Sequence, residues 1–372
     1  MLHVLCVFGT RPDAIKMAPV VLELRRHPEQ FHVRTLATGQ HREQLDQVLN
    51  TFGLRPDRDL GIMEHGQTLA RITVRAMEGM DAVLEAERPD VVIAQGDTTT
   101  TFVAALAAFY RRVPFAHVEA GLRTFNAWDP FPEEMNRRLA GAIARLHFAP
   151  TEEARANLLR EGIEDARIRV TGNTGIDALL WVAARDVPIE DTVLARLLAS
   201  ARRLVTITAH RRENLGAPLE RICRAVRALA ETHPEVDWVY AMHKNPAVRE
   251  TVTAILSRLP NVHLIEPPAY AAFVKLLQRS ALILTDSGGI QEEAPSLGVP
   301  VVVLRETTER PEGIAAGVAW LVGTAVDAIV SKASDLLIAT SGRGAPGPAN
   351  PYGDGRASER IRDALAAEGA LL

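Results

Sequence analysis

Three acidic residues in the first half of the 372-residue chain occupy positions suited to proton transfer. Asp97 and Glu119 each follow a short apolar run, and Glu133 opens a helical pattern just past a Pro-Phe-Pro segment. If the runs are parallel strands, Asp97 and Glu119 share one rim of the sheet, where clustered carboxylates can raise a pKa and create a general base. The structural alternatives are N-capping by Asp97 and helix-dipole complementation by Glu133. Three acids near one rim favour catalysis.

The segment Thr285–Glu293, with sequence TDSGGIQEE, joins an apolar run to a helical pattern. Gly288 and Gly289 would let backbone N–H groups approach a phosphate closely, and the start of a helix adds a partial positive charge. Glu293, one turn further on, could accept hydrogen bonds from ribose hydroxyls. The alternative is an ordinary turn in which Ser287 caps the helix. The strand–turn–helix context favours nucleotide binding.

Basic residues follow other predicted strands. Arg11 lies in the turn after the first strand, and Lys16 follows one helical turn later. His210 begins the segment HRREN, and Arg310 lies in TTERPEG. Each side chain can meet a phosphate or a carboxylate, and solvated charge is the alternative for each.

Alternating strand and helix patterns predict an α/β fold with two doubly wound parallel sheets. The alternation runs from Leu2 to Phe148 and restarts at Leu204. We expect an N-terminal Rossmann-like domain over residues 1–171 and a C-terminal one over 172–355. A last helix, about 356–372, is expected to pack back on the first domain. Two such domains would face a central cleft at their strand ends.

Composition restricts the possible functions. The net charge of −4 argues against a nucleic-acid partner. Two cysteines without ligand spacing indicate neither a disulfide framework nor a metal site. The first residues read as a strand rather than a signal peptide, and no apolar run is long enough to span a membrane. We therefore expect a cytoplasmic protein with no membrane partner.

Several cofactor motifs are missing from the sequence. It contains no G-x-G-x-x-G, no P-loop and no H-E-x-x-H, so we expect neither a cofactor nor a metal. Tyr240 and Lys244 have the spacing of a dehydrogenase pair, but the tyrosine lies in a predicted strand. Four residues along a strand span roughly 13 Å, too far for a shared proton relay. We therefore interpret Tyr240 as a core residue.

Taken together, these segments resemble the non-hydrolysing UDP-N-acetylglucosamine 2-epimerases of bacteria over nearly the whole chain. The matching segments are FGTRPDAIKMAP (Phe8–Pro19), QHREQLDQVL (Gln40–Leu49), QGDTTTT (Gln95–Thr101), HVEAGLRT (His117–Thr124), FPEEMNR (Phe131–Arg137), TGNTGIDALL (Thr171–Leu180), HRREN (His210–Asn214), TDSGGIQEEAPSLGVPV (Thr285–Val301), TTERPEG (Thr307–Gly313) and NPYGDG (Asn350–Gly355).

The resemblance implies the GT-B architecture and a set of site residues. The catalytic candidates are Asp97, Glu119, Glu133 and His210. The substrate-binding candidates are Arg11, Lys16, Phe273, Ser287, Gly288, Gly289, Glu293 and Arg310. Pro268 stands where some relatives have glutamine, which leaves the uracil contact at that position open.

The resemblance also implies a reaction. UDP-N-acetylglucosamine and UDP-N-acetylmannosamine would interconvert by elimination and re-addition of UDP through a glycal intermediate. The alternatives are a GT-B glycosyltransferase, which needs an acceptor, and a hydrolysing 2-epimerase, which releases free N-acetylmannosamine. A sugar-nucleotide sensor without turnover is a further alternative, against which the acidic cluster speaks.

Family members are expected to be homodimers that serve cell-surface polysaccharide synthesis. Bacterial members are regulated by their own UDP-sugar substrate at a neighbouring site. Gln40, His41, Arg42 and Arg211 lie in the segments involved, so allosteric activation is expected by resemblance. Packing and solvated charge are the alternative roles of these residues.

Overall fold

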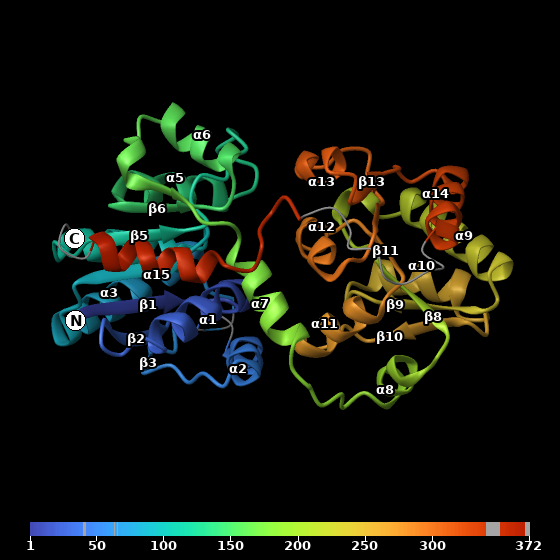
Figure 1. Ribbon diagram of the computed structural model, residues 1–372, viewed down its shortest axis with the longest axis horizontal. Coiled ribbons are helices and arrows are strands. Elements are labelled where there is room, and N and C mark those ends of the chain that lie inside the picture. The colour runs from blue at the N-terminus through green and yellow to red at the C-terminus, as the bar shows by residue number, and fades with distance from the viewer. Residues whose placement is uncertain (40–41, 63, 65, 340–349, 369–372) are drawn as a thin grey trace. The chain divides into compact units, whose positions relative to one another are not determined.

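The computed structural model describes residues 1–39, 42–62, 64, 66–339 and 350–368, without the side chains of residues 42–44. The chain forms two compact units (Figure 1). Unit 1 comprises Met1–Ala178 and Gly353–Leu372, and unit 2 comprises Leu179–Tyr352. The first division falls inside helix α7 (Thr174–Ala183), seven residues after the boundary expected at 171, because this helix continues from one unit into the other.

Unit 1 contains a parallel sheet of seven strands in the order β3-β2-β1-β4-β5-β6-β7. The strands are β1 (Leu2–Phe8), β2 (Phe31–Ala37), β3 (Arg58–Asp59), β4 (Val91–Gln95), β5 (Phe115–Val118), β6 (Leu146–Ala149) and β7 (Ile168–Val170). The helices before α7 are α1 (Arg11–Arg25), α2 (Arg42–Thr51), α3 (Leu69–Glu87), α4 (Thr99–Tyr110), α5 (Glu133–Ile143) and α6 (Glu152–Arg160).

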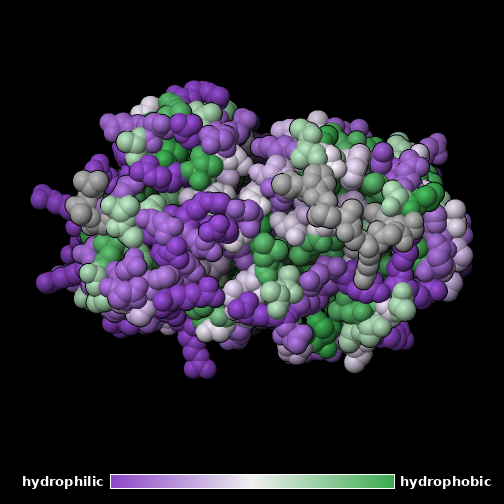
Figure 2. Space-filling model, viewed as in Figure 1, coloured by the Kyte–Doolittle hydropathy of each residue, from purple (hydrophilic) through white to green (hydrophobic). Residues whose placement is uncertain are grey.

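Side chains alternate between the two faces of this sheet, and both faces of the central strands β1 and β4 are covered, so these two strands are mostly apolar. Leu5 and Val7 of β1 join the core formed with α3 and α4, whereas Val4 and Cys6 are buried on the other face. Helices lie on both faces of the sheet in Figure 1. The surface of unit 1 seen in Figure 2 is mainly hydrophilic, with hydrophobic residues in small separate groups.

Unit 2 repeats this arrangement with six parallel strands in the order β10-β9-β8-β11-β12-β13. The strands are β8 (Arg203–Thr208), β9 (Val236–Ala241), β10 (Val262–Ile265), β11 (Leu282–Thr285), β12 (Val301–Val303) and β13 (Ala319–Leu321). The helices after α7 are α8 (Thr192–Ala199), α9 (Ala217–Thr232), α10 (Pro246–Leu256), α11 (Tyr270–Arg279), α12 (Gly288–Glu293), α13 (Pro311–Ala315) and α14 (Val326–Ala339).

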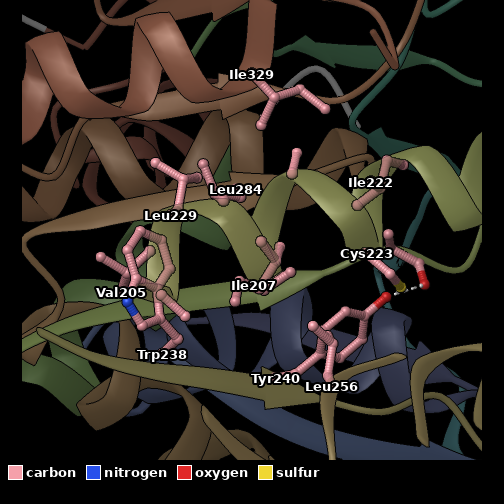
Figure 3. Close-up of a cluster of buried hydrophobic side chains, with 14 of the residues drawn as sticks. Val205, Ile207, Ile222, Cys223, Leu229, Trp238, Tyr240, Leu256, Leu284 and Ile329 are labelled. Atoms are coloured by element: carbon pink, nitrogen blue, oxygen red, sulfur yellow. Dashed lines mark hydrogen bonds between the residues drawn. The ribbon is translucent and has the colours of Figure 1, made fainter. Parts of the chain in front are cut away.

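The largest core of unit 2 lies between its sheet and helices α9, α10 and α14. Trp238 and Tyr240 of β9 are completely buried there; in Figure 3, Tyr240 lies beside Cys223 of α9, and Trp238 lies beside Val205 of β8. The hydroxyl of Tyr240 donates a hydrogen bond to the carbonyl oxygen of Ala209 at 3.2 Å. The interpretation of Tyr240 as a core residue is confirmed.

Helix α15 (Ala357–Glu368) follows unit 2 in the chain but packs on α1 of unit 1. The carboxylate of Asp177 accepts hydrogen bonds from the backbone N–H groups of Ala357 (3.2 Å) and Ser358 (2.7 Å). These bonds satisfy orphan donors at the start of α15. Arg362 adds an ion pair with Glu23. The last helix is thus held at its N-terminus and along its side.

Within the described part of the chain, no helix is both long and apolar enough to cross a membrane.

Candidate active site

The turn after β1 is built around a buried carboxylate, Asp13. It accepts hydrogen bonds from the backbone N–H groups of Gly9 (3.2 Å) and Thr10 (3.1 Å) and from the hydroxyl of Thr98 (3.1 Å). Gly9 packs so closely that a Cβ atom there would lie 2.1 Å from Oγ1 of Thr100. This packing fixes the start of α1, the helix that carries Arg11 and Lys16.

Asp97 lies at the carboxyl end of β4 with 31% of its side chain exposed. Its Oδ2 atom is 2.8 Å from Nη2 of Arg137, on α5. Burial is the main cause that raises the pKa of Asp97 to about 6, against the opposing charge of Arg137. Nearby Glu119 raises the pKa further. Asp97 can therefore gain or lose a proton near neutral pH.

Glu119 follows β5 and forms an ion pair with Lys16. Its φ angle of 61° lies in the left-handed region, which is uncommon for a residue other than glycine. Lys16 and Glu119 influence the ionisation of Asp97 with opposite signs. The structure thus brings the predicted acids Asp97 and Glu119 together with Lys16, a predicted substrate-binding residue, at the same rim of the first sheet.

The two glutamates at the start of α5 differ in their surroundings. Glu133 is partly exposed, and its carbonyl oxygen accepts a hydrogen bond from Nε of Arg137 at 3.3 Å. Glu134 is fully buried and accepts hydrogen bonds from the N–H groups of Thr124 (3.0 Å) and Phe125 (3.2 Å). Glu134 holds the preceding loop, whereas the Glu133 side chain is accessible from solvent.

In unit 2, the buried carboxylate of Asp286 organises the turn after β8. Its Oδ2 atom accepts hydrogen bonds at 2.9 Å from the backbone N–H groups of His210 and Arg211 and from Nδ2 of Asn214. The ring of His210 stacks on that of His243 at a centroid distance of 5.2 Å. Burial lowers the pKa of His210, so its imidazole is mainly neutral at pH 7.

Two guanidinium groups flank the glycine turn at the start of α12. A Cβ atom on Gly288 would lie 3.5 Å from Nη2 of Arg211 and 3.6 Å from Cζ of Arg310. Arg310 also bonds to Glu292 through Nε at 2.5 Å. Tyr352 donates a hydrogen bond to the carbonyl of Arg310 at 3.1 Å. Positive charge and backbone N–H groups therefore converge at Gly288, an arrangement suited to phosphate.

For the remaining predicted residues, the structure gives a position in the fold that does not by itself indicate a role. Phe273 packs partly buried between two apolar clusters of unit 2, and Glu293 ends α12. Gln40, His41 and the side chain of Arg42 lie outside the described residues. Arg211, predicted with them as a possible regulatory residue, lies beside Gly288.

Sequence reasoning missed several residues that shape these sites. Asp13, Asp286 and Arg137 were not singled out, although Asp286 stands inside the TDSGG segment and Arg137 ends the FPEEMNR segment. The sequence could have revealed these residues only through their positions inside the matching segments, because nothing in their residue type alone marks them as part of a site. No group of three or more His, Cys, Asp or Glu side chains able to hold a metal ion occurs among the residues that the structure describes.

Comparison with known proteins places the chain in a family. The family model described as UDP-N-acetylglucosamine 2-epimerase matches residues 22–366. The UDP-N-acetylglucosamine 2-epimerase of Escherichia coli strain K12 is 51% identical over 371 residues, which is 98% of each chain.

Two solved structures are also similar to this chain. The UDP-GlcNAc 2-epimerase of Neisseria meningitidis, bound to UDP-GlcNAc, has a TM-score of 0.84 and 45% identity, over 98% of this chain and 100% of the other. The enzyme of Methanocaldococcus jannaschii, in complex with UDP-GlcNAc and UDP, has a TM-score of 0.77 and 32% identity over the same shares. The predicted α/β fold with two Rossmann-like domains of GT-B type is confirmed. The chain belongs to the UDP-N-acetylglucosamine 2-epimerase family.

Proposed function

We propose that this protein interconverts UDP-N-acetylglucosamine and UDP-N-acetylmannosamine by inverting C2 of the sugar, without net hydrolysis. Family membership supports the substrate, and the relative from Neisseria meningitidis binds UDP-GlcNAc. The observation that carries the proposal is Asp97, a partly exposed carboxylate with a pKa of about 6 beside Arg137 and near the Lys16–Glu119 pair. Such a group can exchange a proton at neutral pH.

The nucleotide is proposed to bind the turn at the start of α12. The backbone of Ser287, Gly288 and Gly289 would hold the diphosphate, and Arg310 would neutralise its charge. The closeness of Arg211 and Arg310 to Gly288 supports this assignment. Glu293 is proposed for the ribose hydroxyls and Phe273 for the uracil. Arg11, Lys16 and His210 complete the proposed set of substrate-binding and charge-stabilising groups.

The first chemical step is proposed to be elimination, since the C2 proton has no adjacent carbonyl to acidify it. The bond between C1 and the UDP oxygen breaks, and UDP leaves with the electron pair. A carboxylate removes the C2 proton, and the electrons of the C–H bond form the C1–C2 double bond of the glycal. Asp97 in its charged form is proposed as this base. Arg310 and His210 would stabilise the charge that develops on UDP.

The second step reverses the first on the opposite face of the sugar. A carboxylic acid gives its proton to C2, the double-bond electrons form the new C–H bond, and an oxygen of UDP attacks C1. Glu119 and Glu133 are proposed for this face. UDP is regenerated as a substituent rather than lost, so neither water nor an acceptor is consumed. Each positioned acid or base contributes on the order of 10²–10⁴ in rate.

The direct test is to incubate the purified chain with UDP-N-acetylglucosamine in deuterated water and analyse the product by NMR. We expect UDP-N-acetylmannosamine with deuterium at C2. Product without deuterium would exclude the exchange route. Free N-acetylmannosamine with UDP would identify a hydrolysing enzyme, and turnover only with an added acceptor would identify a glycosyltransferase.

We also propose that the chain forms a homodimer. Phe109 and Tyr110 at the end of α4 are 62% and 66% exposed. With Ile143 and Phe115 they line an open groove of about 560 Å³ with a mostly apolar lining. Exposed apolar area of this kind favours a protein partner. Analytical ultracentrifugation should give a dimer that Phe109→Glu weakens, and a monomeric parent chain would refute the proposal.

Activation by the substrate at a second site is proposed for Arg211 with Gln40, His41 and Arg42. Sigmoidal dependence of rate on UDP-N-acetylglucosamine would support it. A strictly hyperbolic curve, with UDP-N-acetylmannosamine turned over alone, would exclude it.

A further inference from the structure

Three consecutive carbonyl groups at the end of β4 each accept a hydrogen bond from a side chain of a different element. The carbonyl of Gln95 accepts from Oγ1 of Thr101 on α4 at 2.6 Å. The carbonyl of Gly96 bonds to Nε2 of His117 on β5 at 2.7 Å. The carbonyl of Asp97 accepts from Nδ2 of Asn136 on α5 at 3.0 Å. Residues 95–97, the Asp97 turn, are thus held from three sides.

The middle of these bonds lies on the peptide that leads into Asp97. Gly96 has a φ angle of 79°, and its N–H donates to the carbonyl of Val118 at 3.0 Å. Its own carbonyl belongs to the peptide plane shared with the nitrogen of Asp97. The bond from His117 therefore fixes the rotation of the Gly96–Asp97 peptide, which sets the direction in which the Asp97 side chain leaves the sheet.

The chemistry of His117 suits a fixed donor. The residue is completely buried, and burial lowers its pKa to about 4. The ring is thus neutral at pH 7 and carries one N–H group. A carbonyl oxygen can only accept, so that hydrogen must sit on Nε2. The hydrogen bond selects one tautomer and one ring orientation over the whole range in which the protein would work.

His147 provides an internal comparison. It lies opposite His117 in the register of β5 and β6 and is equally buried. Both of its ring nitrogens lack a hydrogen-bond partner within the described residues, and so does Nδ1 of His117. The two neighbouring histidines thus share strand context and burial, but of the two only the His117 ring has a hydrogen bond to the Asp97 turn.

We propose that His117 is a positioning residue for Asp97, acting through the hydrogen bond from Nε2 to the carbonyl of Gly96. Its effect on turnover rests on the proposed epimerase function, whereas its effect on the ionisation of Asp97 does not. The charged groups that face Asp97 are Arg137 of α5, Glu119 after β5, and Lys16 and Asp13 of α1. Because their influence depends on distance, a displaced carboxylate titrates differently.

The experiment compares four variants of the full chain. His117→Phe removes the donor, His117→Gln keeps an amide N–H near the position of Nε2, and His117→Asn keeps an amide that is too short to reach. His147→Phe is the matched control. Each variant is assayed for kcat and KM, for the pKa of Asp97 by NMR of its carboxyl carbon, and for stability in urea.

We expect His117→Phe and His117→Asn to lower kcat by about 10- to 100-fold, with KM within a few-fold, since misplacement by about 1 Å can cost on that order. The pKa of Asp97 should shift by at least half a unit in both variants. His117→Gln should recover most of kcat and the original pKa, and His147→Phe should retain both.

Other results would overturn the proposal. If His117→Gln and His117→Asn have the same kcat and the same Asp97 pKa, His117 is only a packing residue. The comparison of these two variants tests the proposal even if His117→Phe does not fold. An equal loss in His147→Phe would also make His117 only a packing residue. If the parent chain does not epimerise but the Asp97 pKa differs between His117→Gln and His117→Asn, the proposed function is refuted and the positioning role is supported.

Discussion

Asp97 and Asp286 hold matching places in the two sheets and have opposite surroundings. β4 lies beside β1 in unit 1 as β11 lies beside β8 in unit 2, and each aspartate follows its strand within two residues. Asp286 is completely buried, and one of its oxygens accepts three hydrogen bonds. Asp97 is partly exposed, and Arg137 is its ion-pair partner. The same residue type is a scaffold in one unit and a candidate reactant in the other.

The comparison teaches that position after a strand does not assign a role. Hydrogen-bond donors around a carboxylate tie it to its neighbours, whereas a carboxylate with few donors keeps lone pairs available for a ligand. Unit 1 therefore presents an accessible carboxylate, the group proposed for proton transfer, and unit 2 presents a rigid turn with guanidinium groups beside it.

The largest effect is expected from Asp97→Asn. An amide cannot accept a proton from C2, so kcat should fall by about 10²–10⁴-fold. The affinity for UDP should change little and the stability in urea should not fall, because the amide can keep a bond with Arg137 and removes a charge that burial disfavours. Steady-state kinetics measures kcat, and calorimetric titration measures the affinity for UDP. Retained turnover would remove Asp97 from the mechanism.

The next effect is expected from Asp286→Ala, which sharpens the comparison from the other side. It leaves the N–H groups of His210 and Arg211 and the amide of Asn214 without this acceptor. Lost bonds to a charged group and unsatisfied donors should lower the free energy of unfolding by about 3 kcal/mol. Urea unfolding checks this, with Asp286→Asn as the milder variant. A variant as stable as the parent, yet inactive, would make Asp286 a reactant.

A smaller effect is expected from pH. If Asp97 acts in its charged form, kcat/KM should fall about tenfold per unit as pH drops below about 6. In the folded state its pKa lies above the unfolded value, so its charge costs stability above pH 6 and that cost disappears at lower pH. Burial lowers the pKa of His210, so its titration is displaced toward lower pH. Affinity for UDP-N-acetylglucosamine, measured by calorimetry, should change far less than turnover between pH 7 and pH 5.5.

The smallest effect is expected from Tyr352→Phe. The hydroxyl donates to the carbonyl of Arg310 and accepts from the N–H of Gly313 at 2.9 Å. Its loss should lower stability by about 1 kcal/mol and weaken UDP binding only slightly, since the guanidinium of Arg310 keeps its bond to Glu292. A large loss of affinity would show that the backbone at Arg310 matters as much as its charge.

Much of the fold could be predicted because buried parallel strands are continuous apolar runs. The alternation predicted from Leu2 to Phe148 and again from Leu204 occurs in the two sheets. The two-residue β3 and the short β7 and β13 have too few residues to carry a clear pattern. Helices α6 and α8 lie between Phe148 and Leu204, outside the predicted alternation.

The site was predictable where function leaves a motif and unpredictable where it depends on contacts distant in sequence. Asp97 was identified from its strand, but its pKa depends first on burial and then on the charge of Arg137, 40 residues away. The contact of His117 with Gly96 required the pairing of β4 with β5. The contact of Arg211 with Gly288 required two loops that are far apart in the chain. Whether Glu133, Phe273 and Glu293 touch the substrate stays a prediction.

The docking of α15 on unit 1 has a consequence for how the protein is made. During synthesis on the ribosome, residues 179–352 emerge before Ala357 and Ser358, the N–H donors to Asp177. Until those residues arrive, Asp177 has no helix to cap and the side of α1 that packs against α15 is uncovered. Unit 2 is therefore one continuous segment of the chain, whereas unit 1 is completed only after all of unit 2 has been made.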